Sequence, residues 1–542
     1  MSGRATAGLQ RWLLGEGRYG RAHLKADATA GLTVALVLIP QSMAYAQLAG
    51  LPFYYGLYAA FLPPAVAALL GSSRQLATGP VAVVSLMTAA ALEPLATAGS
   101  EDYVAAAVLL SLLVGGIQLA VGLLRLGVLV NLLSHPVING FTNAAALIIA
   151  SSQLGKLFGV SVNGEGAFLA VLGRTLDAAG RHLHWPTFAM GLLAFAIMMG
   201  LKRLAPRSPS ILVAVVLTTV LSWATGYSDR KTIAAEALAH PAFHAALARY
   251  NQTQTALSAA GAVRAGLQAR LKDADQGETP EARIDLTREL ALARLAEARA
   301  AAERKAEAER LKDYRWIRAE AGPQAERFVP RDGISGGAGG APAAWRLDLG
   351  RGPLAAEQLV LVRGGAVVGT IPRGLPSFGL PQMRLGEAAT LLPYALIIAL
   401  LGFMEAISVA KAMAAKTGQR IEPNRELAGQ GVGNLVGALS ASFPCAGSFS
   451  RSAVNLQAGG QSAVSSAVTS LAVLLTLLFF TPLLYHLPQS VLAAVIMVAV
   501  AGLINIRGFL HAWRAQWFDG AISVLTFAAT LWFAPHLDRG IF

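Results

Sequence analysis

Apolar runs of about twenty residues recur along this chain, and they constrain its fold more than any other feature. A helix of that length spans the hydrocarbon core of a bilayer with its backbone hydrogen-bonded internally. Of the 542 residues, only 14% are charged, against about 25% in an average soluble domain. The sequence therefore predicts an all-α polytopic membrane protein. The apolar windows predict spans at residues 28–48, 53–71, 76–92, 103–123, 129–150, 187–204 and 209–227, and then at 387–409, 426–442, 447–459, 463–482, 489–506 and 518–535.

A long polar stretch, residues 228–360, separates the seven earlier spans from the six later ones. It is rich in Ala, Arg and Glu, and residues 281–320 contain no Gly or Pro, which favours helical hairpin segments. Residues 333–343 (GISGGAGGAPA) predict a flexible linker, and the alternating run 358–370 predicts a short strand or hairpin. We interpret the stretch as an extramembrane helical insertion and linker that acts as a solvated spacer; a module that docks a partner is the alternative.

The net charge of +13 reflects membrane topology. Basic residues precede the first span and lie beside the later ones, without interleaved aromatics, so we expect no nucleic-acid partner. Counted alternately along the spans, they fall mainly on one side, which the positive-inside rule makes cytoplasmic. We therefore expect a multi-pass protein of the bacterial cell inner membrane, with a cytoplasmic N-terminus and the insertion on the outer side. The single cysteine, Cys445, excludes an internal disulfide.

Two predicted spans are interrupted. Residues 78–88 read TGPVAVVSLMT and residues 444–455 read PCAGSFSRSAVN, and each belongs to the third span of its half. Interrupted segments at matching positions in two halves indicate the substrate site of an inverted-repeat transporter. The N-termini of half-helices present unpaired N–H groups and the positive end of the helix dipole, which suits an anion. Kinks that only aid packing are the alternative.

Two charged residues lie inside predicted spans, Glu405 in the eighth and Arg451 in the tenth. An isolated charge in a membrane costs at least a few kcal/mol, so we expect a mutual ion pair, structural or functional, or another site role for each. Protonation of Glu405 would then raise the positive charge offered to an anion by Arg451. Gln41 and Tyr45, one helical turn apart, put two hydrogen-bonding groups on one face of the first span, or join neighbouring spans. No metal-ligand cluster, phosphate loop or nucleophile–base arrangement is evident, so we expect neither an enzyme nor a cofactor.

The same segments carry a family resemblance. The run DATAGLTVALVLIPQSMAYAQLAGLPFYYGLYAAFLPP resembles the opening signature of the SulP family of sulfate permeases and related anion transporters. TGPVAVVSL, HPVINGFTNAAALIIASSQLGKLFGV, GTIPRGLPSF, EAISVAKAMA and GSFSRSAVN resemble further family blocks in the expected order.

The resemblance implies fourteen segments in two inverted repeats of seven. Residues 1–227 would hold segments one to seven, and residues 361–542 would hold segments eight to thirteen. A core domain made of segments one to four and eight to eleven would move against a gate domain in elevator fashion. About thirteen of the fourteen segments are then present, and we expect the last segment and a cytoplasmic STAS domain beyond the chain's end. A homodimer is a further implied assembly.

The resemblance also implies a function and a site. It identifies a secondary active transporter of a small inorganic anion, with proton-coupled sulfate uptake as the working hypothesis. A sodium-coupled bicarbonate transporter or an anion exchanger of the same family is the first alternative; an anion channel or a membrane-anchored interaction protein is the second. Glu405 matches the acidic residue assigned to proton coupling. Ala446 stands where relatives often have Thr, which disfavours a sodium site. The residues implied in anion binding are Gln41, Tyr45, Ala82, Ser448, Phe449, Ser450 and Arg451.

Overall fold

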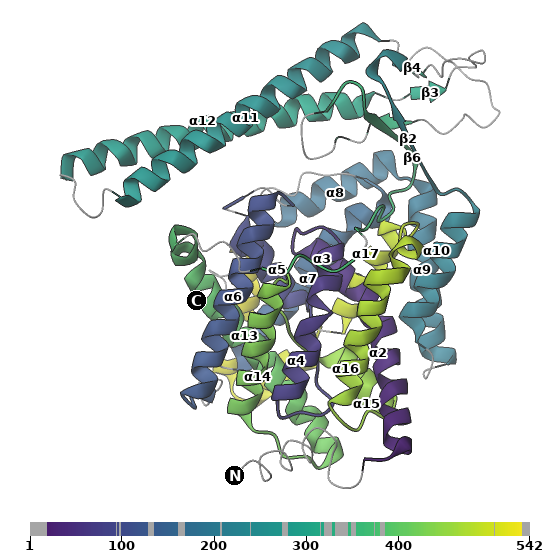
Figure 1. The fold of residues 1–542 in the computed structure, drawn as a ribbon, viewed down its shortest axis with the longest axis vertical. Coiled ribbons are helices and arrows are strands. Elements are labelled where there is room, and N and C mark those ends of the chain that lie inside the picture. Colours follow the sequence, from purple (N-terminus) through teal and green to yellow (C-terminus); the bar gives the residue numbers. More distant parts are fainter. Residues whose placement is uncertain are drawn as a thin grey trace. The chain divides into compact units, whose positions relative to one another are not determined.

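The chain divides into two units, which we describe separately (Figure 1). The membrane unit comprises residues 1–225 and 365–542, and the insertion unit comprises residues 226–364. The computed structural model describes residues 19–533 except 94, 97–98, 128–134, 161–167, 206–208, 239, 274–279, 315, 319–327, 331–344, 348, 350–353, 373, 380–384 and 503.

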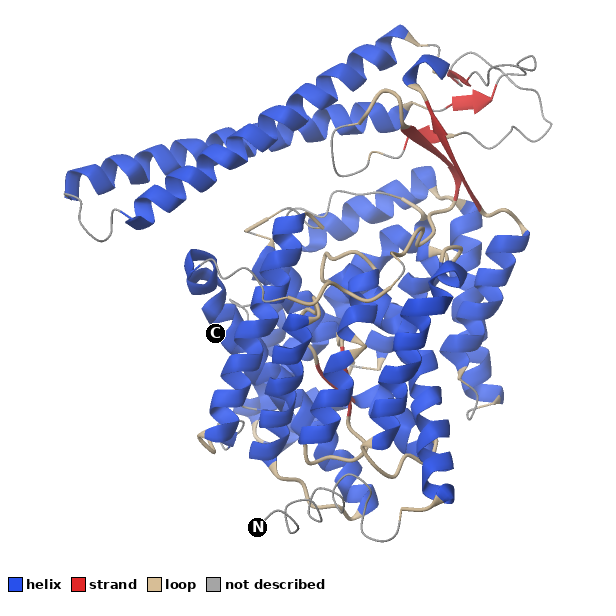
Figure 2. Ribbon diagram, in the orientation of Figure 1, coloured by secondary structure: helices blue, strands red, loops and turns tan. Residues whose placement is uncertain are grey.

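The membrane unit is almost entirely helical (Figure 2). Six of its helical stretches in the described residues are long and apolar enough to cross a membrane, and shorter apolar helices accompany them. The predicted all-α polytopic fold is therefore confirmed. Before the insertion, its elements are α2 (Arg21–Leu48), α3 (Tyr54–Ala59), α4 (Leu62–Leu70), β1 (Ala77–Gly79), α5 (Ala82–Leu92), α6 (Glu101–Leu123), α7 (His135–Phe158), α8 (Phe168–His182), α9 (Trp185–Leu204) and α10 (Ser210–Ala224).

After the insertion, a long helix with an internal proline opens the second set of elements, and two short irregular helices, Thr476–Phe480 and Thr481–Leu484, extend α16. The main elements are α13 (Leu385–Thr417), α14 (Pro423–Leu439), β7 (Ala446–Ser448), α15 (Phe449–Gln457), α16 (Val464–Leu475), α17 (Gln489–Ala501), α18 (Ile506–Ala515) and α19 (Trp517–Phe533).

Several predicted boundaries were wrong for local reasons. The predicted span 53–71 is two helices, α3 and α4, and the second starts with Pro63 and Pro64 in its first turn, where proline is tolerated. The predicted spans 76–92 and 447–459 each combine a short strand with a half-helix. The amphipathic helices α8 and α18 were not predicted, because a search for apolar runs passes over segments whose polar and apolar residues alternate at helical spacing.

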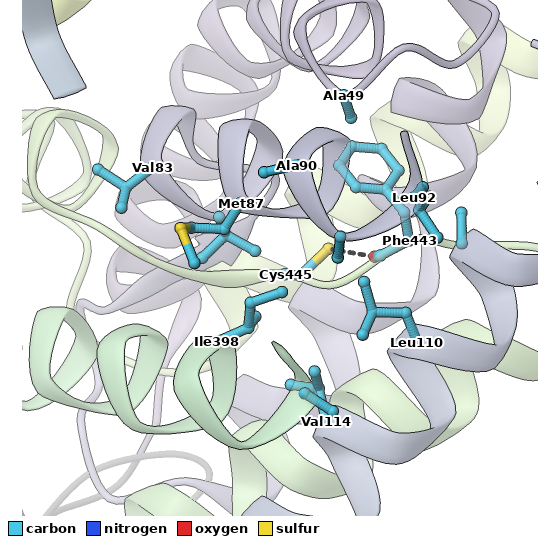
Figure 3. Close-up of a cluster of buried hydrophobic side chains, with 14 of the residues drawn as sticks. Ala49, Val83, Met87, Ala90, Leu92, Leu110, Val114, Ile398, Phe443 and Cys445 are labelled. Atoms are coloured by element: carbon cyan, nitrogen blue, oxygen red, sulfur yellow. Dashed lines mark hydrogen bonds between the residues drawn. The ribbon is translucent and has the colours of Figure 1, made fainter. Parts of the chain in front are cut away.

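Close contacts between helices hold the membrane unit together. A Cβ added at Gly115 of α6 would lie 2.7 Å from the backbone N of Leu435, and one at Gly431 of α14 would lie 2.5 Å from that of Leu119. Backbone contact of this kind depends on residues without a side chain. Helices α5, α6 and α13 also contribute to a cluster of buried hydrophobic side chains that includes Met87. Figure 3 shows this cluster around Cys445, whose thiol forms no disulfide.

The insertion unit has its own core. Helices α11 (Pro241–Asp273) and α12 (Pro280–Asp313) pack side by side as a long hairpin (Figure 1). A sheet of order β2-β6-β5 joins Ser228–Ile233, Leu359–Gly364 and Arg346–Leu347, and β3 (Trp316–Arg318) pairs with β4 (Phe328–Pro330). The helical segments and the strand predicted here are present; the predicted linker 333–343 lies outside the described residues. Trp316, Phe328, Phe243 and Leu359 are fully buried, so this unit folds around an aromatic core.

Candidate functional site

The two interrupted segments meet in the middle of the membrane unit. Strands β1 and β7 pair antiparallel, with Ala77 opposite Ser448 and Gly79 opposite Ala446. Each strand leads into a short helix, α5 or α15, and no side chain among the described residues caps the N-terminus of either helix. The first-turn N–H groups of both helices are therefore directed back toward the strand pair without an intrahelical partner. The positive ends of two helix dipoles converge there, as the sequence pattern predicted.

Gly79 makes this turn possible. Its φ of +144° lies in a region that side-chain-bearing residues rarely adopt. A Cβ at this position would also lie 3.3 Å from Nη2 of Arg451. The glycine thus allows the break between β1 and α5 and keeps space open beside the guanidinium group.

Arg451, in the first turn of α15, is fully buried. Its Nη1 donates to Oε1 of Gln41 at 3.2 Å, and Nε2 of Gln41 donates to the Tyr45 hydroxyl at 3.0 Å. Within the described residues, Nε and Nη2 of Arg451 have no hydrogen-bond partner. A guanidinium group stays charged in proteins, and buried donors without partners are costly. The structure therefore brings Gln41, Tyr45 and Arg451 together and leaves two donors of the arginine available to an anion.

The other predicted binding residues surround the same helix starts. Ala82, the first residue of α5, and Ser448, the residue before α15, are buried. The hydroxyls of Ser448 and Ser450 lie 3.3 Å apart. Phe449 is 55% exposed and Ser450 is also exposed, so one side of the site reaches the accessible surface. The arrangement has a buried, charged wall at Arg451 and an open side at the start of α15.

Glu405 lies on α13, which packs against both β7 and α15. Its side chain is half-buried, and its charge interacts electrostatically with that of Arg451. The direct ion pair that we expected as one outcome is absent from the described residues. The reason is that Arg451 is directed toward Gln41 of α2. A site role for Glu405 stays a prediction.

Side chains from neighbouring helices hold the strand pair in place. The backbone N of Ala77 donates to Oγ of Ser452 at 2.8 Å, and that hydroxyl donates to the backbone O of Ser448 at 2.7 Å. From α14, Nε2 of Gln430 donates to the Thr78 hydroxyl at 2.8 Å. Both strands are therefore fixed by polar contacts that are themselves buried.

A second polar network fixes the segment that leads into β7. Asn434 of α14 accepts from the backbone N of Cys445 at 2.8 Å and donates to Oε1 of Gln118 of α6 at 2.9 Å. Neither Asn434 nor Gln118 was predicted from the sequence as a residue that supports the site. Amides inside apolar spans were the available signal, but that signal does not distinguish helix-joining residues from site residues.

Two fully buried carboxylates were also missed. Asp27 of α2 accepts from the backbone N of Gln461 at 2.6 Å and of Ser462 at 3.1 Å. Glu426 of α14 accepts from the backbone N of Ser72 at 2.7 Å and of Ser73 at 2.9 Å. They anchor the loop after α15 and the loop before β1. Glu405 was identified as a charge well inside a predicted span. Asp27 directly precedes the predicted span 28–48 and Glu426 is the first residue of the span 426–442, so that criterion passed over both.

Comparisons with known proteins agree with this fold. A sequence model described as the sulfate permease family matches residues 24–267 and 355–526. The chain is 30% identical over 515 residues to the chloroplastic sulfate transporter 4.1 of Arabidopsis thaliana, covering 95% of this chain and 56% of that protein. It is 30% identical over 535 residues to a sodium-independent sulfate anion transporter of Bos taurus, covering 97% and 70%. The chain thus spans little more than half the length of the plant relative.

Solved structures share the architecture. The overall structure of SLC26A9 superimposes with a TM-score of 0.67 at 19% identity, covering 100% of this chain and 67% of that one. The transmembrane domain of the cyanobacterial bicarbonate transporter BicA superimposes with a TM-score of 0.60 at 20% identity, covering 94% and 97%. At these identities the likeness concerns the fold. The family match extends over both halves of the membrane unit, and the chain belongs to the sulfate permease family.

Proposed function

We propose that this chain is a secondary active transporter that carries sulfate into a bacterial cell together with protons. The observation that carries the proposal is the buried Arg451, whose Nε and Nη2 have no partner among the described residues and lie beside the N-termini of two half-helices. The names of the relatives as sulfate transporters support sulfate as the anion. The basic residues beside the spans support a cytoplasmic N-terminus.

The chemistry of the site suits an oxyanion that only accepts hydrogen bonds. Sulfate oxygens would accept from Arg451 and from the first-turn N–H groups of α5 and α15, and the hydroxyls of Tyr45 and Ser450 would add donors near the open side. Charge-assisted hydrogen bonds to a guanidinium are about twice as strong as neutral ones. The backbone N–H groups and the guanidinium keep their protons across physiological pH, so the donors of the site do not themselves titrate.

Proton coupling follows from the position of Glu405. While Glu405 is ionised, its charge offsets that of Arg451 across the packed α13–α15 contact. Protonation removes the negative charge and leaves the site more positive, so proton and dianion favour each other's binding. Such coupling is reciprocal, because each ligand changes the affinity for the other by the same factor.

Movement of the core domain as a unit would carry the site across the membrane. The binding residues lie on α2, α5, β7 and α15, and Glu405 lies on α13; all of these belong to core segments under the implied division. Asp27 and Glu426 accept hydrogen bonds from the loops between these segments. These bonds would keep the core segments together while the core domain moves. The gate would include α7, α9, α10, α17 and α19, and α17 lies against α2.

The test is uptake of radiolabelled sulfate into proteoliposomes that contain the purified chain. An inward proton gradient should accelerate uptake, and Arg451→Gln should lower kcat/KM by at least about tenfold, given the usual strength of hydrogen bonds to charged groups. Arg203→Gln, at an exposed arginine of α9, is the matched control. Sulfate uptake that is unaffected by Arg451→Gln would overturn the site assignment.

A sodium-coupled bicarbonate transporter is the second candidate, because one guanidinium and backbone donors accommodate a monoanion as well as a dianion. Sodium-driven bicarbonate uptake in the same vesicles, without sulfate uptake, would establish it in place of the first. Sulfate uptake that requires a counter-anion and no proton gradient would indicate an exchanger. Currents far above transporter turnover, reversing with the anion gradient, would indicate a channel.

A membrane-anchored interaction protein is tested by removal of the insertion unit. Ser228 pairs with Gly364 across the β2–β6 ladder, so the two ends of the insertion unit lie side by side. A short Gly-Ser linker between Thr225 and Gly365 can therefore replace it. We expect sulfate uptake within about twofold of the intact chain. Complete loss of uptake in a folded deletion variant would contradict the spacer interpretation.

A further inference from the structure

A basic cavity lies where α6 ends and α14 begins. Its volume is about 600 Å³, and Arg125, Arg420 and Arg425 line it together with a single acidic residue, Glu422. None of these residues belongs to the anion site around Arg451, and the proposed transport mechanism does not use them. The cavity therefore requires a separate explanation.

The arginines give the cavity an excess of positive charge. The side chains of Arg125 and Arg420 are exposed, and within the described residues they make no hydrogen bond or ion pair. Arg425 donates from Nε to the backbone O of Leu70 at 3.2 Å, which holds it at the wall. Arginine presents several N–H donors in a planar fork that matches the oxygens of a phosphate group. The cavity thus offers two available guanidinium groups beside one that is fixed.

A hydrogen bond and a close backbone contact join the two helices that form the walls of the cavity. The backbone N of Gly127 donates to Oδ1 of Asn424 at 2.8 Å, which ties the end of α6 to the first turn of α14. A Cβ added at Gly122 would lie 2.8 Å from the backbone N of Ala428, so the two helices touch. Arg125 has a φ of +59°, an uncommon conformation for a residue other than glycine. This turn is held in a strained shape that presents the arginine at the cavity.

An apolar edge adjoins the basic cavity. Leu123 and Leu124, at the end of the membrane-spanning helix α6, are 70% and 68% exposed, and Leu126 is 38% exposed. A soluble phosphate would contact the arginines alone. A phospholipid would contact both, with its phosphate at the arginines and its acyl chains along the leucines.

We propose that this cavity binds the headgroup of an anionic phospholipid at the membrane surface. Basic pockets between spanning helices on the cytoplasmic side suit such headgroups, and the positive-inside assignment puts this end of α6 on that side. The bound lipid would join α6 to α14. Because α14 also carries Gln430 and Asn434, which hold the two strands of the anion site, occupancy should stabilise the membrane unit.

The test measures thermal unfolding of the purified full chain in neutral detergent. The probes are short-chain phosphatidylglycerol, short-chain phosphatidylcholine and inorganic phosphate, each titrated separately. Phosphatidylglycerol should raise the Tm at lower concentration than phosphatidylcholine. In the double variant Arg125→Gln/Arg420→Gln, its apparent affinity should fall on the order of 10-fold or more, since each basic side chain near an anionic headgroup contributes a severalfold factor.

Two further variants test whether the effect is specific to the charges of this cavity. Arg203→Gln removes an exposed arginine elsewhere and should leave the titration unchanged, and Glu422→Gln removes the one acidic group and should tighten binding of phosphatidylglycerol. Photoactivatable phosphatidylglycerol should label peptides that contain residues 122–128 or 420–428 of the unmodified chain.

An equal Tm response to phosphatidylglycerol in the double variant and the unmodified chain, or labelling confined to other peptides, would overturn the proposal. An equal stabilisation by inorganic phosphate would also overturn it and would identify a free-anion site.

Discussion

Arg451 and Gly79 illustrate how single residues define the anion site. The guanidinium is buried and has no acidic partner at bonding distance in the part of the chain that the structure describes. The glycine beside it leaves room where any side chain would intrude. The Gly-Pro pair predicted the break before α5, since its conformational effect is local. The pattern of charges predicted an ion pair with Glu405 as one outcome, but the hydrogen-bond partner of Arg451 is Gln41. Residue patterns alone did not predict this bond, because Gln41 lies on another helix and is far from Arg451 in sequence.

The role of Gly79 can be tested with Gly79→Ala. The substitution places a side chain at a φ of +144° and 3.3 Å from Nη2 of Arg451. We expect a stability loss of about 1–3 kcal/mol and sulfate uptake reduced to a small fraction of the original. Tm in detergent and uptake into proteoliposomes are the measurements. Gly116→Ala is the control, because a Cβ there meets no described atom within 4 Å. Equal Tm values and equal uptake rates in the two variants would argue against this role.

Among the elements, the half-helices and their anchored loops define the site. Apolar runs and prolines predicted the interrupted segments, but the three-residue strands β1 and β7 have no sequence signature of their own. They form because the two breaks face each other in the folded chain, and side chains from α14 and α15 complete their hydrogen bonding. The pairing of two such distant segments is a property of the tertiary fold.

Anchoring by Glu426 predicts a specific loss of stability. In Glu426→Gln, the bonds to the backbone N of Ser72 and Ser73 lose their charge assistance. We expect the free energy of unfolding to fall by roughly 2 kcal/mol, with a lower Tm. The exposed Glu422, four residues earlier, provides the matched control: Glu422→Gln in lipid-free detergent should change stability by less than about 0.5 kcal/mol. If the two variants had equal Tm values, Glu426 would have no anchoring role.

At the scale of the whole molecule, the apolar spans predicted a polytopic helical fold, and the comparisons confirm it. The insertion was also predictable, since composition changes sharply near residue 228. The order of strands in its sheet was not predictable, because β2, β5 and β6 come from both ends of that unit. Elevator movement stays a prediction that requires sliding between core and gate.

A cross-link between core and gate tests that sliding. Nε2 of Gln47 in α2 lies 3.5 Å from Oε1 of Gln489 in α17. In the double variant Gln47→Cys/Gln489→Cys, a short bifunctional thiol reagent should link the two helices and stop sulfate uptake, and reductive cleavage of the linker should restore it. The native Cys445 is buried and should not react. Each single cysteine variant is the control; unimpaired uptake by the cross-linked protein would contradict an elevator.

The coupling itself is tested most directly by comparing two transport modes of Glu405→Gln in proteoliposomes. Sulfate–sulfate exchange needs only the anion site, whereas net uptake driven by an inward proton gradient also needs a titrating group. We predict that Glu405→Gln retains exchange within about threefold of the unmodified chain and loses acceleration by the gradient. If the variant were still accelerated by the gradient to the same extent, Glu405 would not be the coupling group, and the proposed link between its protonation and anion binding at Arg451 would be wrong.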